Sequence, residues 1–167
     1  MEPTAEQITS AIEEDYNDGA DVGLLLKILH GLNDKFGYIP QKSISLIAER
    51  LNMSNAEVYG FITFYKDFKF SLPAKHTIKV CLSESCHALG VKGTTDYIKK
   101  NLGFDLRANS VKNDADAIYY SNDGKYSLEY IYCFGNCGAG PTVMIDDKIY
   151  GKMNIENLKN IIKALEE

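Results

Sequence analysis

The stretch Thr77-Ile-Lys-Val-Cys81-Leu-Ser-Glu-Ser-Cys86 decides the fold expected for this 167-residue chain. Its first five residues alternate polar and apolar side chains, as a half-buried strand does, so the first cysteine is expected at a strand end. A second pair, Cys133-Phe-Gly-Asn-Cys137, completes the four cysteines of the sequence. Four thiols confined to two short segments indicate one metal centre, because thiolates are soft ligands that select zinc, copper(I) or iron–sulfur clusters.

The spacing within the two pairs favours an iron–sulfur cluster over a zinc ion. Structural zinc sites use short hooks, commonly with two residues between the cysteines, whereas the spacers here are four and three residues long. Glycines surround the second pair at Gly135, Gly138 and Gly140. They let backbone N–H groups turn toward the thiolates and sulfides of a cluster and offset its charge. Zinc is the main alternative, and a disulfide or free thiols are the third.

The N-terminal sequence shows no sign of secretion, which disfavours disulfides. Residues 1–10 have neither the basic nor the apolar region of a signal peptide. No stretch of the sequence approaches the roughly 18 apolar residues that a membrane-spanning helix needs. We therefore expect a cytoplasmic chain without membrane insertion, in a compartment where thiols stay reduced and can bind metal.

The charge and the apolar pattern divide the chain into three parts. The formal net charge is −5, and residues 1–21 carry seven acidic side chains with no Lys or Arg. We expect this acidic N-terminal segment to present a solvated helix face rather than an electrostatic docking arm. Residues 22–75 predict a helical domain. Residues 76–167 predict a second domain, which contains the cysteines.

Three helices are predicted in the helical domain. The first has apolar residues at helical spacing, at Leu25, Ile28, Leu29, Leu32 and Phe36. Gly37 then supplies a stop, and a second apolar face follows within 44–51. Ser54-Asn-Ala-Glu57 matches a capping box, which opens the third helix. This helix is expected to bury Val58, Phe61, Ile62 and Tyr65.

The second and third helices are spaced like a helix-turn-helix, but their side chains disfavour nucleic-acid binding. Residues 55–65, which would be the recognition helix, contain Asn55 and otherwise mainly apolar and aromatic side chains. Base edges and phosphates are usually read by Arg, Lys, Asn or Gln. There is no basic patch in this region, and the overall charge is negative. We interpret the three helices as a small bundle.

Strands and helices follow one another over residues 76–167. The expected elements are a strand over 77–81, a helix over about 88–101, hairpins over 117–132 and 142–150, and a helix over 154–165. Asp123-Gly124 gives the first hairpin a strong turn signal. Leu89, Tyr97, Ile98 and Leu102 are expected to face inward from the first helix, and Ile155 and Leu158 from the last. This order predicts an α+β sandwich around a small mixed sheet, which matches a thioredoxin-like core.

The cysteine segments resemble those of a known family. Val80-Cys81-x4-Cys86-His-Ala-Leu-Gly90 and residues 133–146 are similar to the thioredoxin-like [2Fe–2S] subunits of NADH-oxidising complexes. That family includes the E subunit of bacterial NADH dehydrogenase (complex I). It also includes the gamma subunit of NAD-dependent formate dehydrogenase and the small subunit of NAD-linked or electron-bifurcating hydrogenases. Residues 30–40 and 58–65 look like its helical N-terminal domain, so the resemblance covers about residues 22–165.

The resemblance implies a fold and a set of ligands. The fold is α+β, with a small helical bundle followed by a thioredoxin-like [2Fe–2S] ferredoxin domain. One [2Fe–2S] cluster would be held by Cys81, Cys86, Cys133 and Cys137. His87 suggests a Rieske centre, in which two histidines replace two cysteines, but the four cysteines already fill the four positions.

The resemblance also implies a role as a one-electron carrier subunit that is not catalytic alone. Its partners would be a flavoprotein subunit, which binds FMN and NAD(H), and further iron–sulfur subunits. The chain itself has no G-x-G-x-x-G fingerprint between a strand and a helix. The segment Ser83-Glu84-Ser85-Cys86 looks more like the formate dehydrogenase branch than like complex I. The alternatives are a zinc-stabilised interaction module and a free-standing thioredoxin-like ferredoxin.

Overall fold

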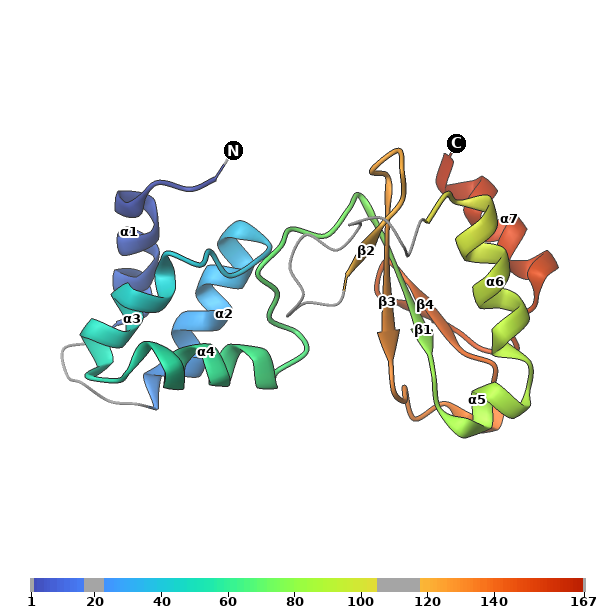
Figure 1. Cartoon of the computed structure of the whole chain (residues 1–167), viewed down its shortest axis with the longest axis horizontal. Helices are drawn as coiled ribbons and strands as arrows, with labels where there is room; N and C mark the ends of the chain where they lie inside the picture. The colour runs from blue at the N-terminus through green and yellow to red at the C-terminus, as the bar shows by residue number, and fades with distance from the viewer. Residues whose placement is uncertain (1, 17–22, 105–117, 167) are drawn as a thin grey trace. The chain divides into compact units, whose positions relative to one another are not determined.

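A computed structural model of the chain describes residues 2–16, 23–104 and 118–166 (Figure 1). The described residues contain seven α-helices and a five-stranded sheet, which confirms the α+β class. Those up to Leu72 form one compact unit, and those from Pro73 onward form a second. Within the described ranges, no helix has the length and apolar character needed to cross a bilayer.

The first unit consists of four helices. They are α1 (Ala5–Asp15), α2 (Leu24–Phe36), α3 (Ser43–Leu51) and α4 (Asn55–Phe64). The three helices predicted from the apolar spacing correspond to α2, α3 and α4. In addition, α1 packs against α2 and α3 through Ile8, Ala11 and Ile12, which are buried in the core of this unit. The acidic side chains Glu6, Glu13 and Glu14 lie on its exposed surface.

The ends of these helices form where the sequence predicts them. Gly37 adopts a left-handed φ of 76°, and its N–H donates to the Asn33 carbonyl at 2.7 Å to close α2. At α4 the capping box is present, with Glu57 N donating to Ser54 Oγ at 3.2 Å and Ser54 N to Glu57 Oε2 at 2.8 Å.

The side chains of α4 follow the prediction only in part. Val58 and Ile62 are buried and Phe61 is partly buried, but the expectation that Tyr65 is buried is wrong. Tyr65 is the C-cap, where the backbone is already extended, so its side chain leaves the apolar face. Phe64 beside it is exposed.

The second unit is built on a mixed sheet. Its strands are β1 (His76–Cys81), β2 (Tyr119–Tyr120), β3 (Tyr126–Ile131), β4 (Val143–Ile145) and β5 (Lys148–Tyr150), in the order β2-β3-β1-β4-β5. β1 runs parallel to β3, and the other neighbours are antiparallel. Both predicted hairpins are therefore present; Ala117, the expected start of the first, lies outside the described residues. Figure 1 shows α6 (Val91–Asn101) and α7 (Ile155–Glu166) together on one side of the sheet.

Two inward-facing predictions in this unit are wrong. The helix expected over 88–101 is present as α6 but begins only at Val91, because Gly90 adopts a left-handed φ of 90° and separates it from the preceding short helix α5 (Glu84–Ala88). Leu89 precedes this break and is exposed. Ile155 is also exposed, because it is the first residue of α7 and lies before the turn that meets the sheet. Ile98 and Leu158 are buried as predicted.

Candidate metal centre

The parallel pairing of β1 and β3 brings the two cysteine segments to one end of the sheet. In this register Cys81 is opposite Ile131, and each is the last residue of its strand. The pairing continues one step further, where Leu82 N donates to the Ile131 carbonyl at 2.7 Å. Cys133 follows two residues after β3, so its segment starts beside Cys81. Parallel strands share a carboxyl edge, which is why both segments leave the sheet at the same place.

The first segment keeps its two thiols inside the protein. Cys81 and Cys86 are each 1% exposed. Between them the chain turns from β1 into α5, which carries Cys86. The Cys81 sulfur lies 3.2 Å from Ser83 Oγ and 3.8 Å from the Tyr132 carbonyl oxygen.

The second segment presents its two thiols to solvent. Cys133 and Cys137 are both exposed. Gly135 has a left-handed φ of 75°, and its N–H donates to the Cys133 sulfur at 3.2 Å. A short 3-10 turn, Cys137–Ala139, follows. This confirms that glycine turns a backbone donor toward a thiol in this segment.

The connection from β5 to α7 is hydrogen-bonded to the residues that follow Cys137 in the second segment. Lys152 N donates to the Ala139 carbonyl at 2.6 Å, and Met153 N donates to the Pro141 carbonyl at 2.9 Å. Gly151 lies so close that a Cβ there would be 2.6 Å from the Ala139 oxygen. The sequence assigns Gly151 no role in the site, because it lies fourteen residues beyond Cys137 and only the fold shows its contact with Ala139.

The two segments meet at Gly140. A Cβ at this position would lie 3.6 Å from the Cys86 sulfur and 2.8 Å from Leu89 Cδ1. The missing side chain therefore allows the second segment to approach the buried thiol of the first. Glycine is used here for close approach rather than for a positive φ.

The groups around Cys81 and Cys137 shift the pKa values of these two thiols in opposite directions. Burial raises the pKa of Cys81, but hydrogen bonds from Ser83 and from the Phe134 backbone outweigh it, so the pKa lies below its usual value. A hydrogen bond with Cys133 and the charge of that thiol raise the pKa of Cys137, and the charge of Cys86 adds to this. A hydrogen bond from Ser85 acts on Cys137 in the opposite direction.

The donor set fits a two-iron cluster. Cys86 affects the pKa of Cys81, and both Cys133 and Cys86 affect the pKa of Cys137, so the four thiols influence one another across the two segments. A [2Fe–2S] cluster takes four such ligands. Hydroxyl and N–H donors are directed at sulfurs of both segments.

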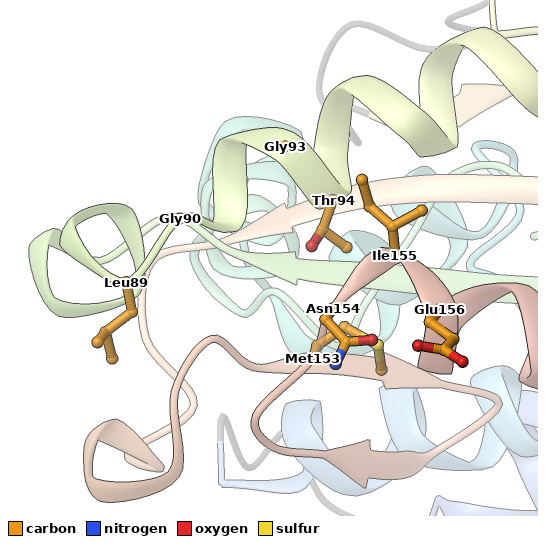
Figure 2. Close-up of a pocket in the computed structure, with 8 residues that line it drawn as sticks. All are labelled: Leu89, Gly90, Gly93, Thr94, Met153, Asn154, Ile155 and Glu156. Atoms are coloured by element: carbon orange, nitrogen blue, oxygen red, sulfur yellow. The ribbon is translucent and has the colours of Figure 1, made fainter.

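A groove of about 440 Å³ lies beside this site, between the N-terminal ends of α6 and α7 (Figure 2). Leu89, Thr94, Met153 and Ile155 are among the residues that line it. No cysteine is among them, so the groove is separate from the candidate metal centre.

Comparison with known proteins identifies the family. The thioredoxin-like [2Fe–2S] ferredoxin family matches residues 9–166. The chain belongs to this family. Its membership confirms the resemblance that the cysteine segments show and the thioredoxin-like character of the second unit.

Two relatives illustrate the kinds of protein in which such chains occur. The chain is 29% identical over 140 residues to the HndA subunit of the NADP-reducing hydrogenase of Solidesulfovibrio fructosivorans, covering 84% of this chain and 75% of the relative. It is 29% identical over 128 residues to the E subunit of the NADH-quinone oxidoreductase of Pseudomonas aeruginosa, covering 77% and 70%. Similarity to the formate dehydrogenase branch stays a prediction, as does the assignment of the four cysteines as ligands.

A solved structure shares the fold. The crystal structure of an air-oxidised NAD+-reducing [NiFe]-hydrogenase aligns with a TM-score of 0.61 over 83% of this chain. The sequence identity is 13%, and the alignment spans 22% of the hydrogenase chain. The likeness shows that this arrangement of elements recurs as one part of a larger chain.

Proposed function

We propose that this chain is the [2Fe–2S] electron-transfer subunit of a multi-subunit NAD(H)-dependent oxidoreductase. Cys81, Cys86, Cys133 and Cys137 would hold the cluster. The observation that carries the proposal is the meeting of two thiol pairs at one end of the sheet, in a chain of the thioredoxin-like [2Fe–2S] family.

A [2Fe–2S] cluster bound by these thiols supplies one-electron oxidation and reduction. The residues of the chain hold it asymmetrically. Cys81 and Cys86 anchor it from inside the protein, where water is excluded, and Cys133 and Cys137 face solvent. The exposed pair leaves little protein between this side of the site and a docked partner. Electron exchange with other subunits therefore takes place at the Cys133–Cys137 segment.

The proposed partners are a flavoprotein subunit that binds FMN and NAD(H) and further iron–sulfur subunits. The names of the relatives support this, because they are subunits of a hydrogenase that reduces NADP and of an NADH-quinone oxidoreductase. The sequence itself lacks the glycine-rich fingerprint of a dinucleotide site. The hydride chemistry is therefore assigned to the partner, and this chain is not catalytic alone.

The cluster content tests the ligand and cofactor proposals. Protein purified without oxygen should contain about two iron atoms and about two acid-labile sulfides per chain. It should give an EPR signal only after one-electron reduction, because the oxidised two-iron cluster has no net spin. Zinc measured in the same sample serves as the control. Equimolar zinc without sulfide would support the zinc-stabilised interaction module and end the redox proposal.

The dependence on a partner tests the role in a complex. We expect the purified, cluster-containing chain to leave NADH unoxidised and its own EPR signal absent when NADH is added. Addition of the flavin-containing subunit of the parent complex should make the cluster reducible by NADH. Dithionite reduction of the chain alone is the control that the cluster is intact. Turnover of NADH by the chain alone would contradict the carrier role, and reduction only by small ferredoxin partners would favour a free-standing ferredoxin.

A further inference from the structure

The hydroxyl of Ser83 lies beside a cysteine sulfur and does not cap the helix that Ser83 precedes. It is the N-cap residue of α5, with an extended backbone (φ −62°, ψ 152°), yet its side chain makes no hydrogen bond to the helix. The other hydroxyl N-caps, Thr4 at α1 and Ser54 at α4, both bond the backbone N–H three residues ahead. The Ser83 hydroxyl instead lies 3.2 Å from the Cys81 sulfur.

The direction of this hydrogen bond follows from the chemistry of a metal ligand. A metal-bound cysteine is a thiolate, which has no proton and can only accept, so the hydroxyl must be the donor. The Cys81 sulfur is also close to the Tyr132 carbonyl, at 3.8 Å, but a carbonyl oxygen cannot donate to it. Cys81 is almost fully buried, and a buried anion is costly unless donors surround it. Of these two groups beside the sulfur, the Ser83 hydroxyl is the one that can donate, and it can be removed by mutation.

We propose that Ser83 is a positioning residue that donates its hydroxyl proton to the Cys81 sulfur and so raises the reduction potential of the cluster. The inference rests on the proposed function, because it requires a [2Fe–2S] cluster on these thiols. Reduction adds one negative charge to the cluster and its ligands, and a hydrogen bond to the more negative state is stronger. The bond therefore stabilises the reduced state more than the oxidised state.

The test is an EPR-monitored redox titration of the full chain and three variants. With Ser83→Ala, the ratio of reduced to oxidised cluster at a fixed poise should fall by about threefold to tenfold, the larger value corresponding to about 59 mV for one electron. Ser83→Thr keeps the hydroxyl and should keep the original potential. The α5 cap is not a complication, because the Ser83 side chain does not contribute to it.

Ser121→Ala is the matched control. The Ser121 hydroxyl bonds Asp123 Oδ1 at 2.6 Å in the turn between β2 and β3, at the end of β3 opposite to Cys133. This variant also replaces a serine hydroxyl by a hydrogen atom in the second unit. It should lower the stability of that unit but leave the reduction potential of the cluster unchanged. If Ser121→Ala shifted the reduction potential as much as Ser83→Ala does, a loss of stability in the unit would explain the shift without the hydrogen bond to sulfur. That result would overturn the proposal.

The remaining outcomes separate this proposal from the proposed function. Absence of iron and sulfide in the unchanged chain would refute the proposed function itself, and the role of Ser83 with it. An intact cluster in the unchanged chain, with the same potential in Ser83→Ala, would refute only the role of Ser83. Partial occupancy does not obscure the result, because EPR reports only the molecules that carry the cluster. Complete loss of the cluster from Ser83→Ala, with Ser83→Thr filled, would make the hydroxyl a requirement for assembly and would overturn the tuning role.

Discussion

Replacing Cys86 by Ala should abolish cluster binding, so that iron and sulfide fall from about two each per chain to background. Cys86 is one of the two buried thiols, and under the proposed ligand set its loss would remove one of the four protein ligands of the cluster. Metal binding is also part of the folding free energy. We therefore expect the second unit to unfold at a lower temperature than the cluster-containing wild type. Iron and sulfide assays together with thermal unfolding measure both effects.

The helical unit provides an internal control for this variant. Its core is separate from that of the second unit and includes Ile28, Leu32 and Ile62. Hydrogen exchange should therefore accelerate in the sheet and in α6 and α7, while protection in α1 to α4 stays unchanged. Cys86→Ser, which keeps the size but supplies a harder oxygen ligand, should also lose the cluster or hold it only weakly. Full occupancy in Cys86→Ala would mean that the proposed ligand set is wrong.

The parts of the fold that the sequence predicts correctly are those with local signals. The alternation from Thr77 to Cys81 gives β1, and Asp123-Gly124 gives the turn between β2 and β3. Ser54 and Glu57 are three residues apart and fix the start of α4 by their mutual hydrogen bonds. Each signal is contained within a few residues, so it can be read without knowing what the segment packs against.

The features that were not predicted depend on partners that are distant in the chain. The acidic residues of α1 dominate its composition, and its three buried side chains become recognisable only when α2 and α3 are present. Leu89 looks like part of one helix until the left-handed Gly90 separates it from α6. For the candidate metal centre, the sequence supplies the four thiols, but the parallel pairing of β1 and β3 brings the two segments that carry them to one end of the sheet. The roles of Ser83 and Gly151 follow from that arrangement.

Gly151→Ala should damage the metal centre from a position fourteen residues beyond Cys137. A Cβ at Gly151 would lie 2.6 Å from the Ala139 carbonyl oxygen and 3.0 Å from the Ala139 Cβ. The carbonyl cannot move away freely, because it accepts the 2.6 Å hydrogen bond from Lys152 N. Since backbone must shift, we expect a loss of about 1–3 kcal/mol in the unfolding free energy of the second unit. Cluster release, followed by the decay of its visible absorption in the presence of a chelator, should be faster.

Gly93→Ala is the matched control, because it makes the same change in the same unit. Gly93 lies in α6, and a Cβ there would meet nothing within 4 Å. Alanine favours the helix over glycine, so this variant should be more stable by up to about 1 kcal/mol and should release its cluster at the original rate. The two substitutions are therefore expected to have opposite signs. If Gly151→Ala matched Gly93→Ala in stability and in cluster release, contact with Gly151 would not hold the second segment in place. The hydrogen bonds of Lys152 and Met153 would then have to account for its support.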